Sequence, residues 1–271
     1  MSTGTEEQAR REAVEIALWA QGRQAPPREV LAELGLLGPD GRVLADDGQE
    51  AGAGNAYGED GSRLPDLGPL APFGSWQSVA ATILRKTADS AGFDQTSTVF
   101  DVFQWILFEI QFASMPFLYD ITEDSRDVSI SSLSLSPAVR AVTDLVGGLV
   151  TEDALTGIVD SIKKIGQLAV ENPGQPEKNS NVQQGVLTVA DGNVRLGLLR
   201  TAVRMEYRSG KGYQQLNQEI SVSRLFGNLD YGMCLRNADI LLEWDGQDVD
   251  DWVNGTSSSP FPANTSPAWD N

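Results

Sequence analysis

The sequence contains no histidine. This absence excludes the Ser-His-Asp and Cys-His arrangements of nucleophilic catalysis, the HExxH zinc site and most other metal sites built on imidazole ligands. Acidic residues gather in segments 120–127 and 245–251, but neither has EF-hand spacing, so solvated loops are expected there. We find no other constellation typical of catalysis. The sequence therefore predicts a protein that is not an enzyme and that has no cofactor, catalytic site or metal site.

Cysteine is nearly absent as well, since Cys234 is the single one in the chain. One cysteine allows neither an intrachain disulfide nor a CxxC site, so the fold does not depend on an oxidising compartment. No stretch has the pattern of a Sec signal or of an unbroken transmembrane helix. We expect the protein to be synthesised in soluble form in the cytoplasm, with any release or export using another route.

Basic residues are scarce relative to acidic ones, with 20 Lys and Arg against 38 Asp and Glu and a formal net charge of −18. Binding to nucleic acid or to an anionic lipid surface draws on clustered cations. The charge therefore predicts no nucleic-acid partner, and it favours a neutral membrane over an anionic one. A basic protein or a receptor is the remaining class of partner.

The distribution of Gly, Pro and Asp divides the chain into four parts. A capping box at Thr5 opens a helix that extends to about Gln21, within an N-terminal helical arm of residues 1–37. Residues 38–71 are rich in Gly and Asp and predict a flexible linker. The main domain is expected at residues 72–244, followed by a surface tail at 245–271.

Within the main domain, predicted helices precede predicted strands. One helix begins after Ser75 and ends at Gly92, and the very apolar segment TSTVFDVFQWILFEIQFASMP predicts a second helix, buried between layers. A strand is expected over residues 127–134 and a loop over 171–184. Further strands are then expected at four places: 185–190, 194–207, 218–226 and 231–244. The order predicts an α+β domain with an antiparallel sheet.

Two short amphipathic helices joined by glycines occupy Ser136–Val170 and separate the first strand from the others. Gly147 and Gly148 form the expected hinge between them. The apolar faces consist of Val139, Val142, Leu145, Val146 and Leu149 in the first helix and of Leu155, Ile158, Val159, Ile162 and Ile165 in the second. Such a pair is an ordinary helical hairpin packed on a core, or a hairpin that leaves its sheet and enters a membrane.

Three stretches carry a resemblance to a known family. The first is the helix Trp76–Ser90, followed by TST and by a helix that ends in Ser114-Met115-Pro116. The second is the hairpin sequence AVTDLVGGLVTEDALTGIVDSI, and the third is ISVSRLFGNLDYGMCLRNADIL. In order and pattern, residues 72–244 resemble the Cyt-type cytolysins, the family of the bacterial Cyt δ-endotoxins, the fungal volvatoxins and the Erwinia virulence factor Evf.

The resemblance implies a single antiparallel sheet between two layers of helical hairpins. It also implies a secreted toxin or virulence factor that perforates or inserts into target-cell membranes after the helix layers move off the sheet, with self-oligomerisation on the membrane. Evf carries a palmitoylated cysteine, which makes Cys234 the candidate for a fatty acyl chain, against the interpretation of an inert buried thiol.

Two other functional classes are compatible with the sequence. The first is a non-lytic binding or cargo protein that uses the same scaffold and docks on a partner through its N-terminal arm. The second, which is less favoured, is a hydrolase that relies on carboxylates alone.

Overall fold

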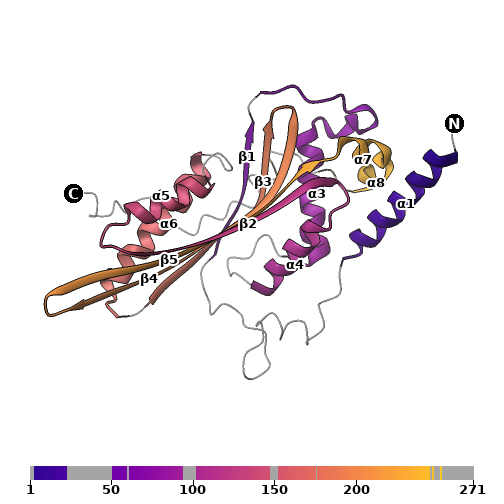
Figure 1. Ribbon diagram of the computed structural model, residues 1–271. Helices are drawn as coiled ribbons and strands as arrows, with labels where there is room; N and C mark the ends of the chain where they lie inside the picture. The colour runs from indigo at the N-terminus through magenta and orange to yellow at the C-terminus, as the bar shows by residue number, and fades with distance from the viewer. Residues whose placement is uncertain are drawn as a thin grey trace, which may run out of the picture.

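The computed structural model describes residues 3–22, 51–59, 61–93, 102–146, 152–174, 176–244, 246 and 251 (Figure 1). The helices are α1 (Thr3–Ala20), the 3-10 helix η1 (Gly68–Phe73), α3 (Trp76–Ala91), α4 (Val102–Ala113), α5 (Ser136–Val146), α6 (Glu152–Glu171), α7 (Tyr231–Arg236) and α8 (Ala238–Glu243). The strands are β1 (Ala51–Glu59), β2 (Leu118–Ser131), β3 (Pro176–Ala190), β4 (Asn193–Gly210) and β5 (Tyr213–Leu229).

The described strands form one five-stranded sheet in the order β1-β3-β4-β5-β2. The pairs β3–β4, β4–β5 and β5–β2 are antiparallel, whereas the edge strand β1 pairs with β3 in parallel. The strands β4 and β5 are long and strongly twisted, and they run from a tip beyond α5 and α6 to the helices α3 and α7 (Figure 1). Helices therefore have two faces on which to pack.

Two separate hydrophobic cores lie on opposite faces of this sheet. Along β4, Val194, Leu196 and Leu198 enter the first core, and Leu199 and Val203 enter the second. Successive side chains of a strand point to opposite faces, so the change from even to odd positions is a change of face. The first core contains side chains of α1, α3, α4, α7 and α8, and the second contains those of α5 and α6. The predicted α+β architecture, one sheet between two helical layers, is confirmed.

The ends of α3 confirm the sequence prediction in detail. The hydroxyl of Ser75 accepts a hydrogen bond from the backbone N–H of Ser78, and this caps the first turn. At the other end, Gly92 adopts the left-handed conformation with φ of 67°. The aromatic helix α4 buries Trp105, Phe108 and Phe112 in the first core, as its composition predicts.

The strand predicted at 231–244 is wrong, because this segment forms α7 and α8. The carboxylate of Asp230 accepts a hydrogen bond from the backbone N–H of Met233 and so starts a helix directly after β5. The buried residues Met233, Cys234, Ala238 and Leu241 follow helical spacing. Met233 and Leu235 are two positions apart, which also fits a strand and explains the wrong prediction.

Several strands extend into segments whose composition predicts loops. The acidic residues of 120–127 lie in β2, residues 176–184 belong to β3, and 51–59, inside the predicted linker, form β1. These segments form strands because a neighbouring strand supplies hydrogen bonds to their backbone. The charged side chains of β2 stay solvated, since β2 is an edge strand of the sheet. The boundaries of the four predicted parts stay a prediction; most of the tail and residues 38–50 lie outside the described residues.

The N-terminal helix α1 packs on the first core. Ile16 and Trp19 are buried, and the indole N–H of Trp19 donates to the carbonyl oxygen of Gln111 at 3.0 Å. The amide of Gln111 in turn donates to the carbonyl oxygen of Trp19 at 2.7 Å. This reciprocal pair fixes the end of α1 to α4.

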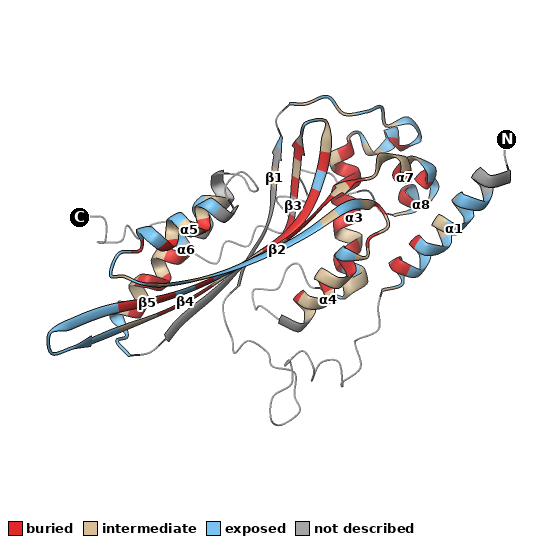
Figure 2. Ribbon diagram, in the orientation of Figure 1, coloured by how far each residue is buried: buried red, intermediate tan, exposed pale blue. Residues whose placement is uncertain are grey.

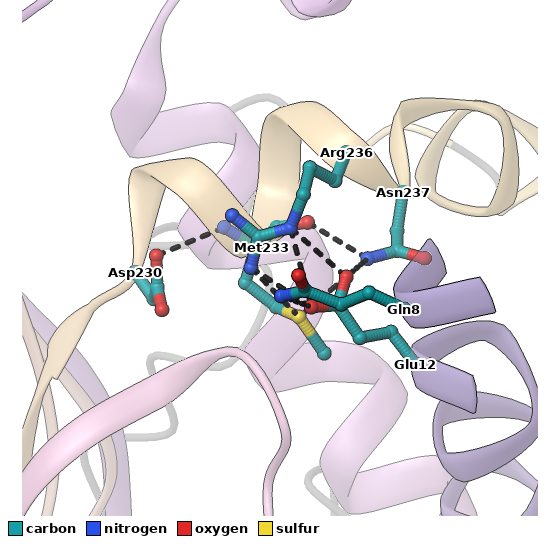
Figure 3. Close-up of polar contacts among 6 residues, drawn as sticks. All are labelled: Gln8, Glu12, Asp230, Met233, Arg236 and Asn237. Atoms are coloured by element: carbon teal, nitrogen blue, oxygen red, sulfur yellow. Dashed lines mark hydrogen bonds and ion pairs between the residues drawn. The ribbon is translucent and has the colours of Figure 1, made fainter. Parts of the chain in front are cut away.

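A second contact holds the middle of α1, through the carboxylate of Glu12 (Figure 3). The Arg236 guanidinium donates to both of its oxygens at 3.0–3.2 Å, and the Asn237 amide donates to it at 3.1 Å. Gln8, one turn earlier on α1, donates at 2.9 Å. The hydrogen bonds from Arg236 hold the pKa of Glu12 below its ordinary value. The side chain of Glu12 is 12% exposed, so water only partly screens the pair.

Glu12→Gln is therefore expected to lower the free energy of unfolding by about 1 kcal/mol at neutral pH. Folding lowers the pKa of the Glu12 carboxyl, so its ionised form stabilises the folded protein at pH values above the unfolded pKa of about 4.3. This stabilisation is lost as the pH falls through the pKa that the carboxyl has in the folded protein. Urea unfolding at pH 7 and pH 3 measures the effect, which should disappear at pH 3. Glu15→Gln, at an exposed position of the same helix, is the control. Equal effects of the two variants at pH 7 would contradict the assignment.

Candidate functional site

The candidate site is the helical layer α5–α6 together with the sheet face beneath it. On the helices, the buried residues are Ala138, Val142, Ile162, Ile165 and Ala169. On the sheet, the buried residues are Leu199, Val203, Met205, Leu216, Ile220, Val222 and Phe226. Beyond the helices, residues 208–215 at the tip of the β4–β5 ribbon are exposed (Figure 2).

The structure brings together part of the predicted apolar face. Val142, Ile162 and Ile165 are buried against the sheet, while Val139 and Leu155 are partly buried beside them and Val159 is half-buried. The side chains of Leu145, Val146 and Ile158 lie outside the described residues. The same holds for Leu149 and for the predicted hinge, Gly147 and Gly148.

The two helices approach closely at Gly166. A methyl group added at this position would lie 2.7 Å from a Cδ atom of Leu135, the buried residue that precedes α5. A side chain at this position would therefore force Leu135 to shift, because the Leu135 side chain lies directly against the backbone of α6. The carbonyl of Leu135 also accepts the first helical hydrogen bond of α5, from Val139 at 3.0 Å.

Both ends of the α5–α6 segment attach to the sheet at the same level along β4 and β5. Before α5, the backbone N–H of Ser132 donates to the carbonyl of Leu216 at 3.1 Å, and after α6, that of Gly174 donates to the carbonyl of Tyr207 at 2.8 Å. Tyr207 and Leu216 are direct partners across β4 and β5. The two connections of the layer thus meet the β4–β5 pair at the same level along the strands.

Gln218 strengthens the first of these attachments. Its side chain is fully buried, and its amide donates to the carbonyl oxygens of Ser132 and Ser134 at 2.7 and 3.0 Å. Sequence analysis missed this role, because Gln218 reads as an ordinary polar position near the start of a strand. Only the register of β5 against the segment after β2 shows its partners.

The layer is independent of the rest of the helices. None of the described side chains of α5 or α6 belongs to the first core, and the substantial contacts of both helices are with each other and with the sheet. The sheet is thus the shared element between the two halves of the molecule. In the described residues, no helix combines the length and the apolar character needed to span a membrane.

Cys234, the candidate for acylation, lies on α7 in the first core and is fully buried. Burial raises the pKa of its thiol well above the ordinary value. A protonated, enclosed thiol is a poor nucleophile. Attachment of an acyl chain would therefore require α7 to move, and it stays a prediction from the sequence.

Comparisons with known proteins find similar solved structures, two of which are described here. The Evf virulence factor aligns over 77% of this chain and 85% of its own, with 11% identity and a TM-score of 0.38. A delta-endotoxin aligns over 79% of this chain and 90% of its own, with 10% identity and a TM-score of 0.35. Both belong to the groups named in the sequence resemblance. No protein-family model and no curated protein sequence matches the chain.

The contact at Gly166 generates a test of the packing within the layer. Gly166→Ala should lower the free energy of unfolding by about 1 kcal/mol, because overpacking outweighs the gain in helix propensity. In a Leu135→Ala background the same change should instead stabilise by about 1 kcal/mol, since the space is free. Chemical denaturation of the wild type, the two single variants and the double variant measures the coupling between positions 135 and 166. Additive effects would contradict the contact.

Proposed function

We propose that the protein is membrane-active and that the α5–α6 layer leaves the sheet as a unit to bring apolar surface into contact with lipid. The proposal is carried by one observation, the second core, in which the described side chains of α5 and α6 pack on the sheet and none comes from another helix. The layer can separate while α1, α3, α4, α7 and α8 stay packed on the opposite face. No chemical reaction is part of this activity.

The free energy of uncovering the sheet decides where the layer can open. Burying one large apolar side chain contributes about 1.5–3 kcal/mol. Seven such residues of β4 and β5 lie beneath the helices, so exposing them to water would cost roughly 10–20 kcal/mol. A domain is stable by only about 5–15 kcal/mol. Opening in water is therefore suppressed, and the uncovered sheet face must meet lipid together with the helices.

The positions of the attachments fit a swinging motion. The two connections meet the sheet at the Tyr207–Leu216 pair, so the layer can rotate about this line without stretching either one. Outer positions of the helices are charged, with Arg140, Asp144 and Asp160 exposed. Such amphipathic helices lie in the interface of a bilayer with the apolar face toward the acyl chains. Contact between uncovered sheet faces would also allow chains to self-associate on the membrane.

The alternative of a cargo protein docked through its N-terminal arm has less surface at its disposal. The inner side of α1 is occupied by its own core through Ile16 and Trp19. Its outer side presents Val14 and Leu18, which are 55% and 63% exposed. Two exposed side chains are a small apolar surface for a stable partner, so we favour the membrane-active function.

Weakening the sheet side of the second core should speed the activity. Val203→Ala removes two buried carbons under the layer and should lower the cost of opening by about 1–3 kcal/mol. The initial rate of dye release from phosphatidylcholine vesicles is then expected to rise about tenfold for each 1.4 kcal/mol.

Val194→Ala is the matched control, since it makes the same change in the same strand on the opposite face. It should lower the free energy of unfolding to a similar extent and leave the rate of release unchanged. Equal acceleration by both variants would show that general destabilisation, and not release of the layer, is responsible. Absence of any binding or release by the wild-type protein would overturn the proposed function.

A further inference from the structure

Toward the tip of the β4–β5 ribbon, the sheet presents an uncovered polar surface on the side opposite to α5 and α6. It consists of the even-numbered positions 204–210 of β4, the odd-numbered positions 213–221 of β5 and the odd-numbered positions 127–131 of β2, which the strand registers place side by side. We refer to this surface as the polar face. Its residues are exposed apart from Glu206 and Asn217, which are half-buried (Figure 2).

The charged side chains of the polar face largely neutralise one another. A guanidinium nitrogen of Arg204 lies 3.0 Å from a carboxylate oxygen of Glu219, its direct partner across the two strands. Arg208 forms an ion pair of 2.7 Å with Glu206 of the same strand. Asp127 is the remaining charged residue at these positions. In a chain with a formal net charge of −18, this face therefore carries little net charge and complements an uncharged ligand better than an anion or a cation.

A hydrogen-bonded set of short polar side chains lies beside these ion pairs. The Gln215 amide donates to Oγ of Ser131 at 2.8 Å and to Oδ1 of Asn217 at 2.9 Å, and the Ser131 hydroxyl donates to the same Oδ1 at 2.8 Å. The side-chain N–H groups of Asn217 make no hydrogen bond within the described residues, so they are available to a ligand. The set joins β2 to β5 and fixes these side chains before any ligand binds, which lowers the entropy cost of binding.

An aromatic ring lies at the end of the polar face, next to the turn of the ribbon. A methyl group added at Gly210 would lie 2.4 Å from Cε1 of Tyr213, so the ring lies directly against the backbone of Gly210. The two residues are direct partners across the strands. Tyr213 is still 56% exposed, so much of the ring is in contact with solvent. It forms an apolar platform at the edge of a surface that is otherwise polar.

We propose that the polar face binds a neutral oligosaccharide, with one sugar ring stacked on Tyr213 and the following rings along β4 and β5. The face of an aromatic ring carries partial negative charge and attracts the polarised C–H bonds of a sugar ring. Sugar hydroxyl groups both donate and accept hydrogen bonds, and they match the amide, hydroxyl, guanidinium and carboxylate groups of this face. Glycan binding goes beyond the proposed membrane activity and does not depend on it.

The length of the polar face favours a chain of sugars over a single one. Side chains that share a face of a strand are about 7 Å apart, so the positions from Tyr213 to Ser221 form a row of roughly 27 Å. Because α5 and α6 pack on the other side of the same strands, a bound oligosaccharide does not contact the second core.

Other classes of partner fit this surface less well. Nucleic acids and sulfated glycans draw on clusters of unpaired cations, whereas Arg204 and Arg208 are engaged with glutamates. A stable protein partner draws on several aromatic or aliphatic anchors. Tyr213 is the single large side chain of this kind at the positions of the polar face.

A panel of hexasaccharides tests the assignment on the full chain. The neutral probes are maltohexaose, cellohexaose, mannohexaose and chitohexaose, a heparin hexasaccharide is the anionic probe, and NMR of the backbone amides of β4 and β5 follows binding. At least one neutral probe should bind and shift the amides of residues 204–221. Tyr213→Ala should weaken its binding about tenfold. Gly210→Ala, which keeps the tyrosine but displaces its ring, should also weaken it.

Tyr119→Ala is the matched control, since Tyr119 is 42% exposed on β2 and pairs with Asn228, away from the polar face. This variant should bind the oligosaccharide as the wild type does. If no neutral probe binds, or if Tyr213→Ala and Tyr119→Ala bind with equal affinity, the assignment is overturned. Tighter binding of the heparin probe than of every neutral probe also overturns it. Self-association that Tyr213→Ala abolishes, without any sugar binding, assigns the face to a second copy of the chain instead.

Discussion

The pairing of β4 with β5 is the interaction on which the rest of the structure depends. The same two strands carry the first core on one face and the second core on the other, with the change of face between Leu198 and Leu199. Among the described residues, the side chains of the two helical layers belong to different cores, and the sheet is what both layers pack on. The proposed movement of the α5–α6 layer rests on this separation.

Much of this architecture could be predicted from local patterns. The caps at Ser75 and Gly92 and the apolar face of Val142, Ile162 and Ile165 follow from spacing along one helix. The predictions fail where strand pairing or a tertiary contact determines the secondary structure. Residues 231–244 offer both period-two and helical patterns, and the cap at Asp230 selects the helices. Polar residues of β1 and β2 form strands because a neighbouring strand provides the hydrogen bonds.

The candidate site was predicted in part for the same reason. The helical hairpin can be recognised in the sequence, but the line at Tyr207 and Leu216 about which we propose that it rotates cannot. It depends on the register that places Tyr207 opposite Leu216, and on Gln218, whose partners lie 84 and 86 residues away along the chain.

Hydrogen exchange of the native protein, with and without phosphatidylcholine vesicles, tests most directly whether lipid releases the layer as a unit. The account predicts that vesicles speed the exchange of the amides of α6, from Ile162 to Ala169, because the uncovered surfaces then meet lipid instead of water. Amides of α3 should exchange at the same rate with and without vesicles, since the first core stays packed. If vesicles change the exchange of α6 and α3 equally, or change neither, the layer does not separate from the sheet, and the account is contradicted.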